Sequence, residues 1–404
     1  MNSHTFTDNI NFFDRRQRLV WPWRGGGIYW LLSGCILGLS FFGVGHPIQA
    51  FAANSRALTL YGDSGKISVG AVHSCAVQVD GGVRCWGSNR HGESTPPSDL
   101  GPAMAVSAGE AFSCAVLVGG AIRCWGSNVD GRSTPPSDLG PAVAVSSATD
   151  GHHSCAVLVG GAVRCWGENV FGEATPPSDL SPVVALSTGF PFSCAVLIGG
   201  AVRCWGSDGY VKFTPPNDLG PVVAVEAGGT HICAVQVDGV VRCWGVNEAE
   251  AIGIEDVGQA MPPNDLDRTV AVSAGWAHSC AVKANGAVQC WGDDSEGEAM
   301  PPSSLESVVA VSAGFRTSCA MQADAVVRCW GNNDFGQATP PADFVKTLES
   351  LVVTPVAPTV TIGGTQAFMA TGTFNDKSIE ELTTGLPFVA NTLSAGDGHT
   401  CAVH

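Results

Sequence analysis

The residues with the most distinctive chemistry in this sequence are cysteines that recur in pairs, with nine residues between the two members. Fourteen of the 16 cysteines form such pairs: Cys75–Cys85, Cys114–Cys124, Cys155–Cys165, Cys194–Cys204, Cys233–Cys243, Cys280–Cys290 and Cys319–Cys329. Zinc is disfavoured because this is not the spacing of a zinc knuckle and no second pair lies at a fixed distance. The pattern favours seven disulfides over the alternative, seven pairs of buried free thiols.

The residues around each pair are those of a β-hairpin. In the copy "SCAVLVGGAIRCWG", two apolar segments flank Gly119 and Gly120, which can adopt the positive φ of a turn. Cys114 and Cys124 share one face of this hairpin only if its loop has an odd number of residues. The consistent apolar pattern favours that register, so a disulfide within each hairpin is geometrically reasonable.

A tryptophan follows the second cysteine of every pair, and an arginine stands two residues before most of these tryptophans. The tryptophans are Trp86, Trp125, Trp166, Trp205, Trp244, Trp291 and Trp330; the arginines are Arg84, Arg123, Arg164, Arg203, Arg242 and Arg328, with Gln289 in the remaining repeat. A ring of tryptophans could bind sugars or peptides. Because large aromatic side chains dominate burial, we expect these tryptophans to be core residues. We expect the arginines to stack on tryptophan between neighbouring repeats rather than to form an anion site.

One repeat position holds His73, His153, His231, His278 and His399, but Phe112, Phe192 and Thr317 elsewhere. This variation argues against a ring of metal ligands or a catalytic base and predicts a hydrogen bond that stabilises a turn. Asp293, Asp294, Glu296 and Glu298 are interpreted as a solvated loop rather than a cation site. The sequence has no nucleophile elbow, phosphate loop, zincin helix or calcium loop, so no catalytic residue, metal or cofactor is expected.

Seven copies of the cysteine-containing unit follow one another, with first cysteines 39, 41, 39, 39, 47 and 39 residues apart. Each copy has three short strand-like segments and a loop rich in Gly, Asn and Pro, which interrupts a β-ladder. A unit of about 40 residues with three or four strands suits one blade of a β-propeller, in which neighbouring blades cover each other. The sequence predicts an all-β fold of about seven blades over residues 58–344.

The repeat "VSAGEAFSCAVLVGGAIRCWGSNVDG" and its six sister copies resemble the regulator of chromosome condensation repeat. In that family seven units form a seven-bladed propeller, so the resemblance implies seven blades here. The units are shorter than the eukaryotic ones and are more similar to those of bacterial secreted members, which include a propeller-type inhibitor of β-lactamase.

The first 52 residues have the order of an export signal. A basic leader with Arg15 and Arg24 precedes the uncharged residues 25–45, and small residues then predict cleavage after Ala52. An uncleaved anchor over residues 28–45 is the alternative, and "LSGC" at Cys35 also fits a lipoprotein box. Export agrees with disulfides, which persist in oxidising compartments.

The repeat pattern stops after residue 344. "VTPVAPTVTIGGTQAFMATGTFNDKS" and the following "ELT" resemble the first half of a bacterial group 2 immunoglobulin-like domain, which we assign to residues 345–388. Residues 389–404 then begin an eighth propeller repeat with "SAGDGHTCAVH". Its single Cys401 favours a truncated copy, and the alternative is a unit that supplies a closing strand.

The fifth repeat carries an eight-residue excess within "VNEAEAIGIEDVGQAM", residues 246–261. Glu248, Glu250, Glu255 and Asp256 make this segment acidic. Insertions in repeat proteins map to loops on one face, which is often the binding face. We therefore predict that this loop faces a partner, with a tolerated surface insertion as the alternative.

The net charge is −16, and such an acidic chain repels phosphate backbones, so nucleic-acid binding is not expected. The predicted function is that of an exported or cell-surface scaffold that binds an extracellular or envelope protein, or a glycan, without catalysis. A secreted enzyme inhibitor or a propeller enzyme is the alternative. Nucleotide exchange on a small GTPase, by analogy with the eukaryotic family, is more remote because the leader, the charge and the cysteines oppose it.

Overall fold

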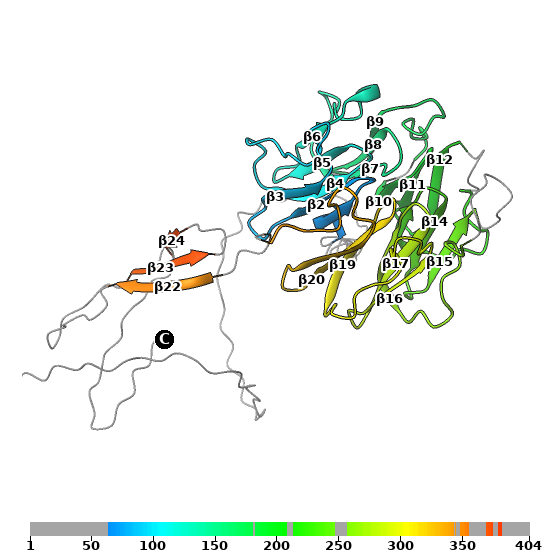
Figure 1. Ribbon diagram of the computed structural model, residues 1–404. Helices are drawn as coiled ribbons and strands as arrows, with labels where there is room; N and C mark the ends of the chain where they lie inside the picture. Colours follow the sequence, from blue (N-terminus) through cyan, green and yellow to red (C-terminus); the bar gives the residue numbers. More distant parts are fainter. Residues whose placement is uncertain are drawn as a thin grey trace, which may run out of the picture. The chain divides into compact units, whose positions relative to one another are not determined.

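The computed structural model describes residues 64–180, 182–207, 213–246, 257–342, 344, 348–354, 369–374 and 379–381. Seven antiparallel sheets of three strands each arise from the seven repeats (Figure 1). The first strands are β1 (Ile67–Val69), β4 (Ala103–Ala108), β7 (Ala142–Ser147), β10 (Val183–Thr188), β13 (Val222–Ala227), β16 (Thr269–Ala274) and β19 (Val308–Ala313). The second strands are β2 (His73–Val77), β5 (Phe112–Leu117), β8 (His153–Leu158), β11 (Phe192–Leu197), β14 (His231–Gln236), β17 (His278–Lys283) and β20 (Thr317–Gln322).

The third strands are β3 (Val83–Gly87), β6 (Ile122–Gly126), β9 (Val163–Gly167), β12 (Val202–Gly206), β15 (Val241–Gly245), β18 (Val288–Gly292) and β21 (Val327–Gly331). Each first strand contacts the first strands of both neighbouring sheets, and β1 contacts β19. The seven first strands therefore form a closed inner circle, which is the arrangement of an all-β propeller with seven blades. Among the described residues, two short 3₁₀ helices lie outside the sheets, η1 (Ser64–Lys66) and η2 (Val129–Gly131).

The hairpin register predicted from the cysteines is confirmed. In the first blade Val77 pairs with Val83, which leaves residues 78–82, an odd number, in the loop, and Cys75 lies directly opposite Cys85. All seven pairs form disulfides, with S–S distances of 1.99–2.07 Å and Cα–Cα distances of 4.0–4.1 Å. Every blade thus has a covalent link between its second and third strands.

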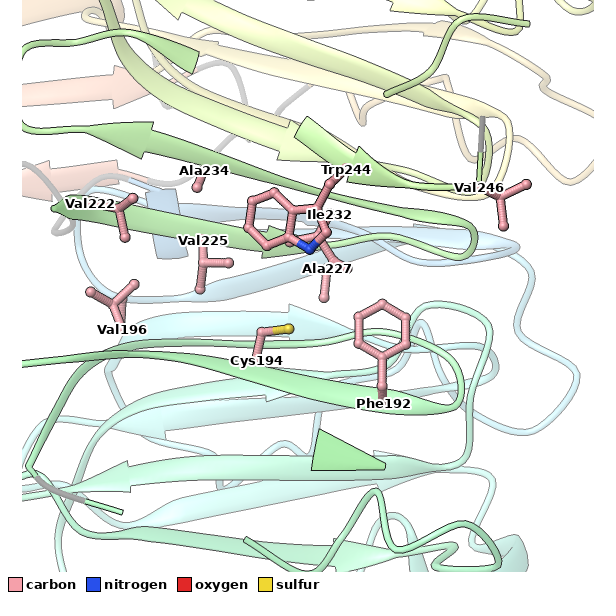
Figure 2. Close-up of a cluster of buried hydrophobic side chains, with 11 residues drawn as sticks. Phe192, Cys194, Val196, Val222, Val225, Ala227, Ile232, Ala234, Trp244 and Val246 are labelled. Atoms are coloured by element: carbon pink, nitrogen blue, oxygen red, sulfur yellow. The ribbon is translucent and has the colours of Figure 1, made fainter. Parts of the chain in front are cut away.

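The hydrophobic core lies between neighbouring blades rather than within one blade. Figure 2 shows one such layer, in which Phe192 and Val196 of the fourth blade face Val225, Ile232 and the Trp244 ring of the fifth. The seven tryptophans that follow the second cysteines are all buried, as predicted. Since neither face of a blade is covered by its own residues, each blade depends on the next one for burial of its apolar side chains.

The tryptophans also make a hydrogen bond that repeats around the ring. Each indole Nε1 donates to a backbone carbonyl in the loop that follows the third strand of the preceding blade. The acceptor–tryptophan pairs are Gln337–Trp86 (2.8 Å), Glu93–Trp125 (2.9 Å), Arg132–Trp166 (2.9 Å), Glu173–Trp205 (2.9 Å), Phe213–Trp244 (3.1 Å), Gln259–Trp291 (3.0 Å) and Glu298–Trp330 (2.8 Å). We call this contact the inter-blade clasp. The Gln337–Trp86 member joins the seventh blade to the first and closes the ring.

Glycine after each tryptophan makes room for the clasp. Gly126, with φ of +94°, follows Trp125, and a Cβ there would lie 2.8 Å from the Ala111 carbonyl oxygen and 3.1 Å from the Glu93 Cα. A larger residue would therefore push the loop of the preceding blade away from the tryptophan. This explains why the motif is "CWG" in all seven repeats.

The histidine series forms buried hydrogen bonds between blades. The Nε2 atoms of His73, His153, His231 and His278 lie 2.6–2.9 Å from a serine Oγ of the next blade: Ser113, Ser193, Ser279 and Ser318, respectively. Each of these serines donates its hydroxyl to the clasp carbonyl. The histidine must then donate from Nε2, so the neutral ring carries its proton on Nε2. The predicted hydrogen bond is confirmed, although it joins two blades instead of stabilising a turn.

Burial lowers the pKa of His73 and His278 to about 4, and that of His153 and His231 to about 3. Where the fourth blade has Phe192 in place of histidine, the fifth has Ile232 in place of the serine, and the two side chains belong to one apolar layer (Figure 2). A neutral polar pair and an apolar pair are thus two solutions to the same buried junction.

A second set of contacts joins the first strands around the channel. A serine Oγ in one first strand accepts a backbone N–H from the next blade at six junctions, as in Ser68 with Ala108 (2.9 Å). Glu226 occupies the serine position of the fifth blade. Burial raises its pKa to about 8, and a hydrogen bond with Ser187 offsets only part of that effect.

The arginine series has a different partner from the tryptophan that we expected. Arg123 pairs with Asp99 at 3.1 Å, and equivalent pairs join Arg164 to Asp138, Arg203 to Asp179 and Arg242 to Asp218. The aspartate comes from the Pro-rich loop of the preceding blade. Gln289 makes the same contact with Asp265, so the exception preserves the junction. Because these pairs are exposed, each contributes little to stability.

A further antiparallel sheet consists of β22 (Leu348–Thr354), β23 (Met369–Phe374) and β24 (Ile379–Glu381). The immunoglobulin-like assignment of residues 345–388 stays a prediction. The leader with Ala52 and residues 28–45, and the eighth repeat over residues 389–404, lie outside the described residues. Within the part of the chain that is described, no helix is long and apolar enough to cross a membrane.

The disulfides predict a thiol count. Denatured protein that has not been reduced should expose at most two reactive thiols, Cys35 and Cys401, because the other cysteines are bonded. Reduction before alkylation should add 14 thiols, as counted by mass spectrometry, to reach 16 in the full chain or 15 after cleavage at Ala52. About fourteen additional thiols without reductant would contradict the bonded state.

The buried histidines predict a loss of stability in acid. In the folded chain the pKa of His231 lies near 3, below the value of 6.5 expected when it is unfolded, so the unfolded state binds more protons below pH 6.5. Stability is therefore complete above that pH and falls as pH decreases towards the folded value. His231→Phe should reduce the loss in unfolding free energy between pH 7 and pH 5 by about 2 kcal/mol, measured by chemical denaturation.

The double variant His231→Phe/Ser279→Ile copies the Phe192–Ile232 pair and provides the matched control. It should fold and show the same reduced pH dependence as the single variant. An unchanged pH dependence in both would mean that His231 is not held neutral.

Candidate binding face

One end of the ring collects the residues that differ between repeats. We define the loop face as the turns that join the first and second strands together with the loops that leave the third strands. Hydrogen bonds join the two sets, as between Ser88 N and the Val72 carbonyl (2.9 Å) and between Ser127 N and the Ala111 carbonyl (2.9 Å). The clasp fixes the backbone of the loops that follow the third strands. The side chains that point outward from these loops can therefore differ from one repeat to the next.

Half-buried aromatic side chains lie on this face near the channel. Trp276 and Phe315 come from corresponding turns of the sixth and seventh blades, and their ring centroids are 5.3 Å apart. The Arg316 guanidinium lies 5.6 Å from the Phe315 centroid. Phe190 and Trp276 line a cavity of about 10 Å³, which has room for no more than one water. Aromatic side chains beside an arginine are typical of energetically important interface residues.

A cluster of charged side chains lies on the same face, at the junction of the second and third blades. Arg132 Nη1 lies 2.7 Å from Glu110 Oε2, and the Arg132 side chain is only 5% exposed. The same carboxylate oxygen lies 2.7 Å from His152 Nε2. Arg132 also donates to Ser127 Oγ (3.0 Å) and packs over the Phe112 ring. Glu110 is thus held by two cationic or donor groups, one of them buried.

The other nitrogen of His152 faces two more carboxylates. His152 Nδ1 lies 3.4 Å from Asp130 Oδ2 and 3.4 Å from Glu168 Oε2. Burial, and then the nearby charge of Glu110, raise the pKa of Asp150 in the same turn to about 6. These residues are of the types that hold a metal ion, and the donor atoms of Asp130, His152 and Glu168 lie within 4.8 Å of one another.

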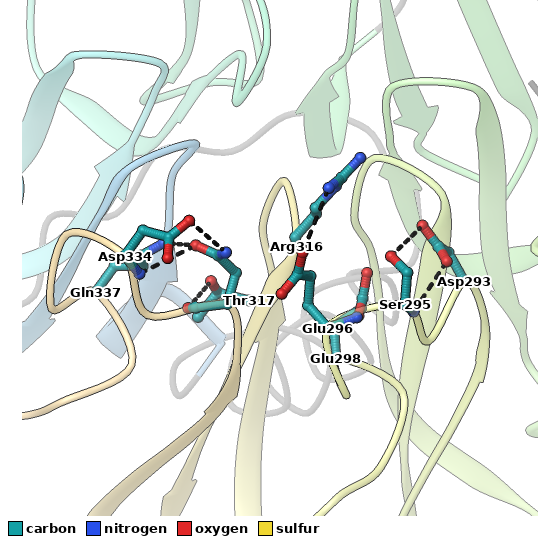
Figure 3. A network of polar contacts seen from close by, with 9 residues as sticks. Asp293, Ser295, Glu296, Glu298, Arg316, Thr317, Asp334 and Gln337 are labelled. Atoms are coloured by element: carbon teal, nitrogen blue, oxygen red, sulfur yellow. Dashed lines mark hydrogen bonds and ion pairs between the residues drawn. The ribbon is translucent and has the colours of Figure 1, made fainter.

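A polar network covers the corresponding junction of the sixth and seventh blades (Figure 3). Glu296 and Arg316 form an ion pair at 3.6 Å, and Thr317 Oγ1 donates to the Asn332 carbonyl at 2.8 Å. Gln337 Oε1 accepts the Phe335 backbone N–H at 2.9 Å. The network holds both loops in fixed positions relative to the aromatic pair.

The interpretation of Asp293, Asp294, Glu296 and Glu298 as a solvated loop is wrong for Glu298. This side chain is 0% exposed, and its Oε2 accepts the Glu296 backbone N–H at 2.8 Å. Burial raises its pKa. Glu93 and Glu173 make the equivalent bond in their own blades, so this carboxylate shapes the loop whose carbonyl forms the clasp.

The predicted partner-facing residues Glu248, Glu250, Glu255 and Asp256 lie outside the described residues. Both flanks of the insertion are described and lie on the loop face. Val246 N donates to the Thr230 carbonyl at 2.9 Å, and Gln259 Nε2 donates to the Val246 carbonyl at 3.0 Å. The segment therefore leaves from and returns to the face that carries the aromatic and charged groups.

Sequence reasoning missed the cluster at the second and third blades and the aromatic group. Two signals were available. The spacing from Cys114 to Cys155 is 41 residues rather than 39, and the excess lies in the turn that carries Asp150 and His152. Arg132 stands where five other repeats have Glu or Gln. Comparison of corresponding turns would also have separated Trp276 from the core tryptophans.

Four segments of the chain match the model of the Regulator of chromosome condensation (RCC1) repeat: residues 66–93, 105–132, 270–298 and 308–337. These are the first, second, sixth and seventh blades. The chain thus carries repeats of this family in an RCC1-like β-propeller. No curated protein matches the chain.

Solved structures of similar fold include two plant receptor-kinase ectodomains. The entire ectodomain of CR4 from Physcomitrella patens has 24% identity and a TM-score of 0.55, over 66% of this chain and 73% of that chain. The CRINKLY WD40 ectodomain of Arabidopsis thaliana ACR4 has 24% identity and a TM-score of 0.52, over 66% and 94%. Human WBSCR16 has 17% identity and a TM-score of 0.50, over 62% and 84%. At this identity the likeness establishes the fold alone.

Arg132 provides a test of how the cluster is built. Arg132→Ala should lower the unfolding free energy by about 2 kcal/mol, because it removes buried packing on Phe112 and the donor to Glu110. Arg132→Gln installs the residue of the fifth and seventh repeats and should cost less than half as much. Urea denaturation measures both, and equal losses would contradict this account of the site.

Proposed function

We propose that this protein is an exported, non-catalytic scaffold that binds a protein partner through the loop face of its propeller. The observation that carries the proposal is the concentration of non-repeating residues on that face. The group formed by Trp276, Phe315 and Arg316 combines apolar area with a positive charge, and such groups supply much of the binding energy at interfaces. The acidic insertion begins and ends on the same face.

The redox chemistry supports the proposed location. Seven disulfides require an oxidising environment, because cytosolic proteins of most organisms are kept reduced. The similar folds of two receptor-kinase ectodomains are consistent with a place outside the cytosol. The leader that ends near Ala52 supports export to the extracellular space, the periplasm or the cell surface.

A catalytic role is the second candidate, and one observation favours it. Glu110, Asp130 and His152 form a set of titratable side chains on two blades only, and catalytic sites bring such groups together. The cluster has no nucleophile beside the histidine among its described contacts, so binding remains the better-supported function. No feature in the described part of the loop face supports nucleotide exchange on a GTPase. The net charge of −16 also opposes binding to nucleic acid.

Affinity capture tests the proposal. The oxidised chain would be immobilised and exposed to envelope extract and spent medium, with Trp276→Ala/Phe315→Ala as the loop-face variant. Loss of these aromatic side chains should weaken retention of a stoichiometric partner at least 10-fold. Deletion of residues 248–257 tests the insertion in the same way.

The matched control is Val118→Ala/Val159→Ala, which removes exposed apolar side chains at the hairpins of the opposite end. Retention should be unchanged in this control. If the loop-face variant retains the partner and the control variant does not, the interface lies at the hairpin end and the proposal is contradicted. If no protein is captured and the chain binds a glycan on a glycan array, the ligand is a sugar rather than a protein.

A further inference from the structure

We propose that Asp130, His152 and Glu168 bind a divalent transition-metal ion of the Zn²⁺ class on the loop face. The ligand atoms are His152 Nδ1, Asp130 Oδ2 and Glu168 Oε2. This site is independent of the partner proposed above, since it rests on the geometry of the second and third blades alone. It differs from our expectation from the sequence that the chain has no metal site.

Two of the three separations between donor atoms match the edge of a tetrahedral site. Zn²⁺ binds imidazole nitrogen and carboxylate oxygen at about 2.0–2.1 Å, which gives a tetrahedron edge of about 3.3–3.4 Å. The two distances from His152 Nδ1, to Asp130 and to Glu168, are both 3.4 Å. The three donor atoms all lie within 4.8 Å of one another, so an ion bound by His152 would need at most a movement of the two carboxylates towards each other.

Three separate elements bring the ligands together. Asp130 is in η2, where its φ of 56° is a left-handed conformation that few non-glycine residues adopt. His152 is in the longer turn between β7 and β8. Glu168 directly follows β9, and its backbone N–H donates to the His152 carbonyl at 2.9 Å. The segments that carry His152 and Glu168 are thus fixed to each other by the backbone.

The surroundings of His152 select the correct ring nitrogen. Its Nε2 lies 2.7 Å from Glu110 Oε2, which leaves Nδ1 as the nitrogen that faces Asp130 and Glu168. Carboxylate, imidazole and metal in this order are a recurring arrangement in zinc proteins. Buried Arg132 in turn holds Glu110 in position.

The ligand set distinguishes between metals. Ca²⁺ and Mg²⁺ prefer sites made of oxygen ligands only, whereas imidazole suits Zn²⁺ and its neighbours in the transition series. Three protein ligands leave a coordination position for water or for an oxygen atom of another molecule. The carboxylates of Asp130 and Glu168 would neutralise the charge of a divalent ion.

Zinc titration tests the proposal. The full oxidised chain, with Cys35 and Cys401 alkylated, would compete with a chromophoric chelator for Zn²⁺ in millimolar Ca²⁺ and Mg²⁺. One Zn²⁺ per chain is expected. His152→Gln should weaken binding at least 100-fold, and Glu110→Gln, which removes a positioning residue rather than a ligand, should weaken it 10- to 100-fold.

His91→Gln is the matched control, because His91 is an exposed histidine of the first blade at the repeat position of Asp130. It should leave affinity unchanged, and near-UV circular dichroism should show that every variant is folded. Absence of stoichiometric binding, or equal affinity in the wild-type chain and in folded His152→Gln, would overturn the proposal. So would ¹⁵N NMR spectra that show both nitrogens of His152 protonated with and without Zn²⁺, since a proton would then take the place of the metal.

Discussion

The inter-blade clasp is the interaction on which the rest of this structure depends. In each clasp, a backbone carbonyl in the loop after the third strand of one blade accepts the indole N–H of the tryptophan in the next blade. The Glu93 carbonyl is an example. The clasp places that tryptophan in the apolar layer between the blades and holds the loop that carries the carbonyl. Because the Gln337–Trp86 contact has the same form as the others, the seventh blade joins the first in the same way as every other blade joins its neighbour.

Because of this contact, the residues that all repeats share hold the fold together, and the residues that vary between repeats lie on the loop face. Disulfides fix the second strand to the third, and the clasp fixes one blade to the next, so the outer side chains of the loop face contribute little to the fold. Glu110, His152 and Trp276 lie in turns of this kind. At one buried junction the pair of Phe192 and Ile232 replaces the pair of histidine and serine.

Much of the fold could be predicted because it repeats. Seven copies of a two-cysteine hairpin with an odd loop determine the number of blades, the register of Cys75 with Cys85, and the burial of the tryptophans. Contacts between blades could not be predicted, since nothing in one repeat shows that Arg123 reaches Asp99 of the preceding one. The charged cluster was missed for the same reason: Asp130, His152 and Glu168 are separated in sequence and meet only after two blades have packed.

The most direct test of the clasp is hydrogen exchange of the tryptophan indole protons, measured by NMR on ¹⁵N-tryptophan-labelled protein. The chain has 11 tryptophans, and seven of them donate to a clasp carbonyl. The account predicts that these seven indole protons exchange slowly and together, and only through global unfolding, because all lie in one closed ring. Fast exchange at several of them in the folded protein would contradict it.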